Sequence, residues 1–325
     1  MAIRDPAAGP RTAFVLSGGG NLAVSQVGMM RALVEREILP DVIVGTSAGA
    51  LNGAVLATEP TLDGVERLTD VWCSLRAGEV FPGGKLSRAW TVLSRDDHLF
   101  SNEGLQAIID RANPAPSFDQ TVLPLRVVAT DLHSGEEVVF AAGPIAPALL
   151  ASAALPGIYP PVEHDGRTLI DGAVTNSVPM SHVMTDSIER VYVMNVAGGG
   201  PADQPIRSPL GVAVRAFNIS RNQRFDLELR NTPEHVDVIV LPRPDDDREL
   251  LDFSDALMLT IEAHALAAKF LDAGPSIMAR RPVKRRWWRR SRRSGSRSLR
   301  SPLPRNPGGP GAGEPDPLSR DGSSS

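Results

Sequence analysis

The residues best suited to catalysis lie at the turn Gly45-x-Ser47-x-Gly49, which joins an apolar run to a helix-forming stretch. Residues 42–44 are β-branched and apolar, as in a buried strand, and a helix-favouring sequence starts at Ala48. A serine on such a strand-to-helix turn points its Oγ away from the sheet, and flanking glycines keep the crowded turn free of Cβ clashes. The pattern predicts a nucleophile elbow with Ser47 as the nucleophile. The alternative is an ordinary Gly/Ser-rich turn, because GxSxG also arises by chance.

A run of three glycines follows the first strand pattern, residues 12–16, and precedes apolar residues at helical spacing. Such a loop is typical of a dinucleotide site, of an oxyanion hole, or of a purely structural turn. A dinucleotide site needs an acidic residue at the far end of the second strand, whereas Asp41 lies at its near end. In a parallel sheet the loop and the Ser47 turn emerge at the same edge. We therefore expect an oxyanion hole whose N–H donors belong to Gly18, Gly19 and Gly20.

A serine nucleophile needs a base, and the chain offers six histidines: His98, His133, His164, His182, His235 and His264. An α/β-hydrolase would use one of them, but that fold has several strands before its elbow, whereas this chain has one strand-helix unit there. A carboxylate at a strand end is the simpler candidate, because a desolvated Asp beside the hydroxyl can accept its proton directly. The sequence Asp171-Gly172-Ala173, directly after the apolar residues 168–170, provides such a carboxylate.

These residues need a scaffold in which strands alternate with helices. Apolar runs predict strands at 12–16, 42–44, 125–131, 137–141, 168–170, 190–196 and 236–241. Helical spacing predicts helices at 22–34, 55–75 with a break near Pro60, 103–111, 145–154, 212–229 and 254–271. Residues 76–100 show neither pattern. The alternation predicts an α/β sheet sandwiched between helices.

Taken together, the motifs resemble those of the bacterial patatin-like phospholipases. Four blocks carry the resemblance along residues 14–185: Leu16-Ser-Gly-Gly-Gly20, Gly45-Thr-Ser-Ala-Gly49, Ala151-Ser-Ala-Ala-Leu-Pro156 with Pro160-Pro161, and Asp171-Gly-Ala173 with Asn176 and Pro179. The resemblance implies a three-layer sandwich, in which helices flank a central, mostly parallel sheet, and a Ser–Asp dyad without histidine. It implies Ser47 as nucleophile, Asp171 as base and the glycine run as oxyanion hole, with support from Gly45, Gly49, Gly172 and Ala173.

The chain departs from this family at two places. Members often have Lys or Arg and then Gly after the glycine run, whereas this chain has Leu22 and Ala23. The loop therefore lacks a cation that could contact a phosphate or headgroup. Ala173 stands where many members have a second glycine, although both forms occur in the family.

The predicted function is a serine carboxylic-ester hydrolase that cleaves fatty-acyl esters of lipids, with no cofactor and no metal. Two functions from other classes remain as alternatives. A dinucleotide-binding oxidoreductase would use the run from Gly18 to Ala23, and a catalytically silent lipid-binding or scaffold protein would use neither Ser47 nor Asp171.

Composition divides the 325-residue chain unevenly. The net charge is −4, but residues 1–279 hold 21 Lys/Arg against 35 Asp/Glu, whereas residues 280–325 hold 13 against 3. The hydrophobic content of 42% suffices for a large core. We expect a catalytic region at 12–185, an α/β completion of the same body at 186–279, and a disordered tail of Arg, Ser, Pro and Gly at 280–325.

The basic tail and the chain start bear on location. One cysteine, Cys73, allows no internal disulfide, and neither a signal peptide nor a spanning segment is evident, which predicts a cytoplasmic protein. The cluster Lys284 to Arg293 contains Trp287 and Trp288, a combination that favours a peripheral contact with an anionic inner membrane face. A solubilising tail is the plainer alternative, nucleic-acid binding is a weaker one, and the oligomeric state is not predicted.

Overall fold

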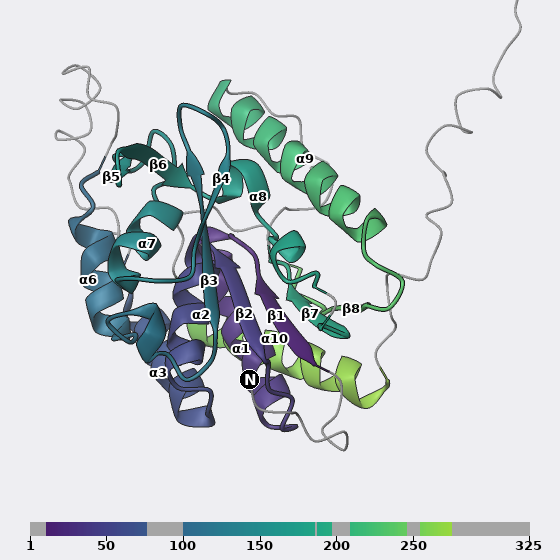
Figure 1. Ribbon diagram of the computed structural model, residues 1–325. Helices are drawn as coiled ribbons and strands as arrows, with labels where there is room; N and C mark the ends of the chain where they lie inside the picture. The colour runs from purple at the N-terminus through teal and green to yellow at the C-terminus, as the bar shows by residue number, and fades with distance from the viewer. Residues whose placement is uncertain (1–10, 77–99, 186, 197–208, 246–253, 275–325) are drawn as a thin grey trace, which may run out of the picture. The chain divides into compact units, whose positions relative to one another are not determined.

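The computed structural model describes residues 11–76, 100–185, 187–196, 209–245 and 254–274, and Figure 1 shows their arrangement. The strands form one eight-stranded sheet whose hydrogen-bonded order is β5-β6-β3-β2-β1-β7-β8, with β4 also paired with β3. No helix within the described ranges is long and apolar enough to cross a bilayer.

Five strands form the parallel part of the sheet, in the order β3-β2-β1-β7-β8. They are β1 (Thr12–Leu16), β2 (Val42–Thr46), β3 (Leu125–Asp131), β7 (Arg190–Met194) and β8 (Asp237–Val240). Their apolar runs are buried on both faces, as expected where helices cover both sides of a sheet. Because β1 and β2 are parallel, the glycine run and the Ser47 turn do leave the sheet at one edge.

Three shorter strands form an antiparallel part. They are β4 (Glu137–Phe140), β5 (Val162–His164) and β6 (Arg167–Asp171). The turn at residues 132–136 joins β3 to β4 as a hairpin. Strand β5 was not predicted, because three residues with little burial leave no apolar pattern to detect.

Strands β2 and β6 lie end to end along the same edge of β3. Val127 and Val128 pair with both β2 and β4, so these two strands lie on opposite edges of β3. Ala129 and Thr130 pair with both β4 and β6, which places β6 on the edge that β2 occupies. Thr46 pairs with Val128 and Asp171 with Ala129, so the two strands end against consecutive residues of β3.

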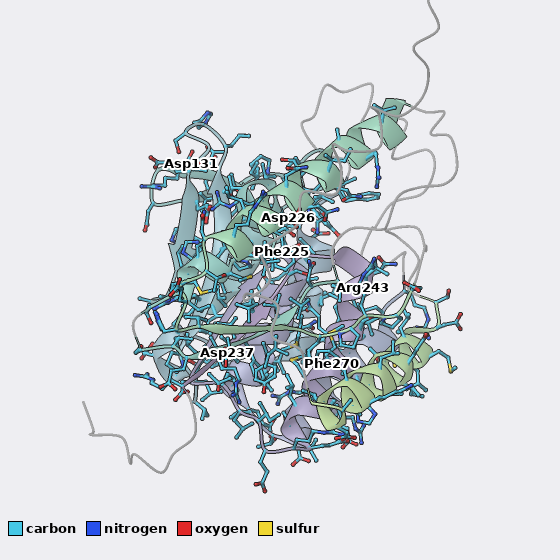
Figure 2. All side chains as sticks on the ribbon, turned by 90° about the vertical axis from the view of Figure 1, so that its right-hand side faces the viewer. Asp131, Phe225, Asp226, Asp237, Arg243 and Phe270 are labelled. Atoms are coloured by element: carbon cyan, nitrogen blue, oxygen red, sulfur yellow. The ribbon has the colours of Figure 1, made fainter. Side chains whose placement is uncertain are left out.

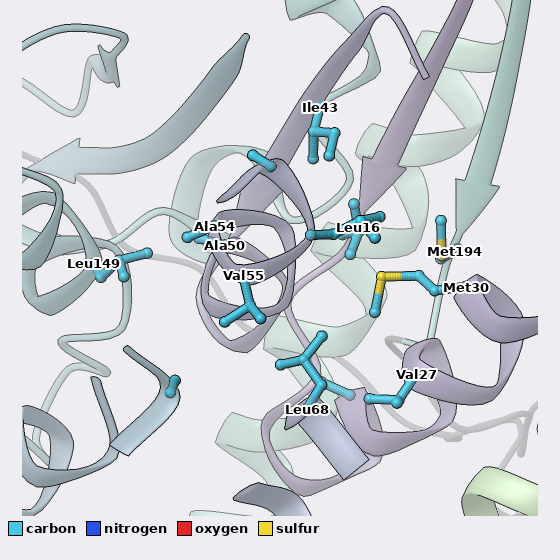
Figure 3. Packing of buried hydrophobic residues seen from close by; sticks show 14 of the residues in the cluster. Leu16, Val27, Met30, Ile43, Ala50, Ala54, Val55, Leu68, Leu149 and Met194 are labelled. Atoms are coloured by element: carbon cyan, nitrogen blue, oxygen red, sulfur yellow. The ribbon is translucent and has the colours of Figure 1, made fainter. Parts of the chain in front are cut away.

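One face of the sheet is covered by most of the helices. They are α1 (Val24–Val34), α2 (Ala48–Thr58), α3 (Leu62–Ser74), α6 (Glu103–Ala112), α7 (Ile145–Ser152) and α10 (Ala256–Asp272), together with the short turns η1 (Gly20–Ala23) and η2 (Phe118–Gln120). Figure 3 shows the resulting core, in which Leu16 and Ile43 of the sheet meet Val27, Val55 and Leu68 of the helices. The predicted break near Pro60 separates α2 from α3.

The opposite face carries a smaller apolar cluster. Alternate strand residues such as Val15 and Val128 pack there against the segment around α8 (Ala173–Asn176) and η3 (Met180–His182), and against α9 (Pro209–Arg230). In Figure 2, Phe225 on α9 belongs to this second cluster, whereas Phe270 on α10 belongs to the first. The described residues therefore form a three-layer α/β sandwich, and the predicted fold class is confirmed.

Candidate active site

Ser47 sits on the turn between β2 and α2 in a strained conformation. Its φ of 57° and ψ of −131° are unusual for a residue with a Cβ and cost on the order of 1–3 kcal/mol. The surroundings hold this turn in place, because the Ser47 N–H donates to Ser152 Oγ at 2.8 Å. Ser152 is fully buried and itself donates to the Val128 carbonyl at 2.6 Å. The turn is thereby tied to β3 through a serine on α7.

Asp171 lies against the Ser47 side chain at the end of β6. Ser47 Oγ donates to Asp171 Oδ2 at 2.7 Å, and the Ala173 N–H donates to Asp171 Oδ1 at 2.8 Å. The Asp171 side chain is 2% exposed. Burial raises its pKa to about 6, although the hydrogen bonds from Ala173 and Ser47 and the charge of Arg221 oppose that rise. A buried carboxylate with a raised pKa therefore lies within hydrogen-bond distance of the Ser47 hydroxyl.

Three glycines of the motifs permit close packing around these two residues. A Cβ on Gly172 would lie 2.1 Å from the Val128 carbonyl oxygen, and one on Gly49 would lie 2.4 Å from the Ser17 carbonyl oxygen. At Gly45 the same atom would lie 2.6 Å from the Gly49 carbonyl oxygen. Backbone atoms cannot move aside cheaply, so a side chain at any of these positions would push the Ser47 turn or the Asp171 turn out of place.

The glycine run lies beside Ser47, but its three N–H groups are not equivalent. The Gly18 N–H already donates to the Ser177 carbonyl at 3.0 Å, so of the three predicted oxyanion donors this one has a protein partner. Within the described residues, the N–H groups of Gly19 and Gly20 have no hydrogen-bond acceptor. Gly20 has a φ of 56°, which glycine adopts without steric cost. A Cβ on Gly18 would lie 3.3 Å from Ser47 Cβ, which shows how near the run is to the serine.

Buried polar side chains hold the glycine run from the helix side. Gln26 donates from Nε2 to the carbonyls of Ser17 and Met194, at 2.8 Å and 3.0 Å. Asn52 donates to Gln26 Oε1, and the Trp72 indole donates to Asn52 Oδ1, each at 2.9 Å. Because each of these buried groups has partners, the loop has one well-defined position.

No histidine in the described part of the chain hydrogen-bonds to Ser47 or Asp171. His182 is paired with Glu137, and His264 with Glu35. His98 lies outside the described residues. In the same described ranges, no group of three or more His, Cys, Asp or Glu side chains is arranged to hold a metal ion.

Two groups near the dyad were not predicted from the sequence. Ser152 belongs to one of the four blocks, but no spacing rule indicates that its hydroxyl would bridge the Ser47 turn and β3. Arg221, on α9, donates from Nη2 to the Gly18 carbonyl at 3.1 Å, across 203 positions of sequence. Nothing local in the sequence marks this arginine among the several on the helix.

Known proteins of one family are similar to this chain in sequence. The family model described as patatin-like phospholipase matches residues 14–184. An uncharacterised NTE family protein of Mycobacterium tuberculosis is 31% identical over 202 residues, which cover 59% of this chain and 51% of that protein. Patatin-like phospholipase domain-containing protein 7 of Mus musculus is 28% identical over 60% of this chain and 14% of its own length. The chain therefore spans about half the length of the mycobacterial relative.

More distant similarity is found to a triacylglycerol lipase, ptl2, of Schizosaccharomyces pombe, which is 26% identical over 54% of this chain and 31% of its own length. Among solved structures, VipD from Legionella pneumophila superposes with a TM-score of 0.46 at 14% identity, covering 83% of this chain and 68% of that one. The family model spans all four sequence blocks and both residues of the Ser–Asp pair. The chain belongs to the patatin-like phospholipase family.

Proposed function

We propose that this protein is a serine hydrolase of lipid esters, in which Ser47 is the nucleophile and Asp171 is the general base. The observation that carries the proposal is the 2.7 Å hydrogen bond from Ser47 Oγ to a buried carboxylate whose pKa is raised to about 6. Family membership and the names of relatives, which include a phospholipase domain protein and a triacylglycerol lipase, support fatty-acyl esters as the substrate class.

The reaction would proceed in two steps. Ser47 Oγ attacks the ester carbonyl carbon while its proton passes to Asp171 Oδ2, and the negative charge that leaves the carboxylate appears on the carbonyl oxygen. The N–H groups of Gly19 and Gly20 would stabilise that oxyanion. The intermediate collapses, the alcohol departs with the proton from Asp171, and an acyl-Ser47 ester remains. Water then attacks this ester with Asp171 again as base, which releases the fatty acid and regenerates Ser47.

Labelling with a fluorophosphonate probe tests the nucleophile. We expect stoichiometric modification of Ser47, located by peptide mass spectrometry, together with hydrolysis of a p-nitrophenyl ester. Ser47→Ala is the matched control and should lose both. A folded wild-type protein that resists the probe and hydrolyses no ester would favour the silent lipid-binding alternative. A higher melting temperature on addition of NAD would instead favour the dinucleotide-binding alternative.

We also propose that the basic cluster Lys284 to Arg293 docks the enzyme on anionic lipid. This cluster lies outside the described residues, and the support is compositional. Indole rings such as those of Trp287 and Trp288 settle at a bilayer interface, and each nearby Arg gains roughly 1 kcal/mol at an anionic surface. Binding to the membrane surface would keep a lipid hydrolase close to its substrates.

Deletion of residues 280–325 should leave hydrolysis of a soluble monomeric ester within about twofold of wild type, because the dyad and its supports all precede residue 230. Binding to phosphatidylglycerol vesicles at low salt should fall strongly, and binding to phosphatidylcholine vesicles should change little. A full-length variant in which Trp287 and Trp288 are both Ala serves as the matched control, with intermediate binding expected. Equal vesicle binding by the full-length and truncated proteins would refute this role.

A further inference from the structure

Helix α9 brings a fixed guanidinium to the glycine run. Arg221 Nη2 donates to the Gly18 carbonyl at 3.1 Å, and Nη1 donates to Asn218 Oδ1 at 3.3 Å. The guanidinium carbon lies 5.4 Å from the centre of the Phe217 ring, in a cation–π contact. Because Phe217 and Asn218 lie one turn earlier on α9, the helix itself orients the arginine toward the loop.

The acceptor of this hydrogen bond is chemically linked to one of the proposed oxyanion donors. The Gly18 carbonyl and the Gly19 N–H belong to the same peptide unit. A cation at the carbonyl oxygen polarises that unit and makes its N–H a stronger donor, and it fixes the plane in which the N–H points. The preceding peptide unit is held differently, by Gln26 at the Ser17 carbonyl and by Ser177 at the Gly18 N–H.

The same guanidinium acts on the proposed base. Burial lowers the pKa of Arg221, and the charge of Asp171 opposes that change. In return, Arg221 is the charged group in the described part of the chain that acts on Asp171, whose pKa it lowers against the effect of burial. In the proposed acylation step, negative charge moves from Asp171 to the substrate oxygen. Arg221 acts electrostatically on Asp171 and is hydrogen-bonded to the peptide unit whose N–H would face that oxygen.

Helix α9 is anchored firmly enough to hold this residue in place. Glu228, which is buried, accepts from the Ser181 N–H at 3.1 Å and from Asn176 Nδ2 at 2.9 Å. Arg224 donates to Glu137 Oε1 at 2.9 Å, and Phe225 packs against the second apolar cluster. These contacts join α9 to β4, to α8 and to the sheet.

We propose that Arg221 is a positioning residue of the oxyanion hole, which holds the Gly18–Gly19 peptide unit through the Gly18 carbonyl. This inference rests on the proposed ester hydrolysis. The role is notable because residues 22 and 23 of the loop, Leu and Ala, provide no cation themselves. Helix α9, outside the segment matched by the family model, is thus a part of the active site.

Arg221→Met tests this role with a side chain of similar length and no charge. We expect kcat for a neutral p-nitrophenyl ester to fall about tenfold, less than the 10²–10³-fold loss on removal of an oxyanion donor, with KM nearly unchanged. We also expect the acid limb of the kcat/KM profile to move to higher pH. Arg221→Lys, which keeps the charge, should restore that limb and part of kcat. Arg230→Met, an exposed position on the same helix, is the matched control and should behave as wild type.

The role of Arg221 and the proposed ester hydrolysis can fail separately in these experiments. A wild-type enzyme without esterase activity would refute the hydrolase itself. An active wild type together with a folded Arg221→Met variant of unchanged kcat and unchanged acid limb would overturn only the role of Arg221. If Arg221→Met fails to fold, as judged by circular dichroism, Arg221→Lys decides: a kcat equal to that of wild type would overturn the proposal, and a reduced kcat with the wild-type acid limb would support it.

Discussion

Replacing Asp171 with Asn is expected to lower kcat by at least about 10²-fold at pH 7.5 and to stabilise the folded protein at the same pH. The loss follows because an amide cannot accept the Ser47 proton. The higher stability is expected because burial raises the carboxyl pKa from 3.8 to about 6 in the folded state. A raised pKa means that the charged form opposes folding.

The stability cost of the Asp171 charge depends on pH. Below pH 3.8 the carboxyl is protonated in both the folded and the unfolded protein, and its charge costs nothing. The cost grows between pH 3.8 and about 6 and is complete above that range. Denaturant melts should therefore show Asp171→Asn more stable than wild type by on the order of 1–3 kcal/mol at pH 7.5, with a smaller difference at pH 4.

The wild-type pH profile provides a second measurement of the same group. In the proposed mechanism the free enzyme needs an ionised Asp171, so kcat/KM should fall about tenfold per pH unit below about pH 6. His264→Gln, which affects only the pair with Glu35, is the matched control and should retain activity. A folded histidine variant as inactive as Ser47→Ala would contradict the Ser–Asp assignment.

A second large loss of activity is expected from a substitution in the glycine run. Gly19→Ala should lower kcat by about 10²-fold, on the order of 3 kcal/mol of transition-state stabilisation, with the fold retained. A Cβ on Gly19 would lie 2.6 Å from Val196 Cγ2, so either the stiff, buried Val196 side chain or the loop must shift. We expect the loop to shift and its N–H groups to turn from the oxyanion. Steady-state kinetics and circular dichroism on the same samples measure the loss and check the fold.

The structure offers a matched rescue for this variant. The other atoms nearest to the added Cβ, both in Val196, are 3.7 Å away, which is an ordinary contact. The double variant Gly19→Ala/Val196→Ala removes Cγ2 and should recover much of kcat, while Val196→Ala alone should remain close to wild type. Wild-type kcat in a folded Gly19→Ala variant would remove the glycine run from the proposed mechanism.

Local patterns in the sequence predicted the elements of the site better than its contacts. The turn at Ser47, the glycine run and the Asp171 turn each follow an apolar strand pattern and contain glycines. Their location at strand ends could therefore be predicted from the sequence. The hydrogen bond from the Gly18 N–H to the Ser177 carbonyl could not be predicted from the sequence, because the two residues meet only in the folded chain. Arg221 was missed for a similar reason, since its partner lies 203 positions earlier in the chain.

The sheet itself was predicted in outline only. Alternating strands and helices indicated a parallel sheet between helices. The five neighbouring strands β3, β2, β1, β7 and β8 are parallel, as that alternation predicts. The pairing of β6 with β3 joins strands far apart in the chain, and strand propensity does not encode such a pairing. Residues 168–170 were predicted as a strand, but neither their direction nor their place along β3 followed from composition.

The end-to-end placement of β2 and β6 makes the alignment of one ladder decisive. Side chains alternate between the two faces of a sheet, so sliding a strand by one residue turns every side chain to the other face. A one-residue slip of β6 along β3 would turn Asp171 away and bring Ile170 opposite Ala129 in its place. The distance between Ser47 and Asp171 is therefore set by backbone hydrogen bonds, and a single-residue insertion or deletion in β6 would separate the two side chains without altering either residue.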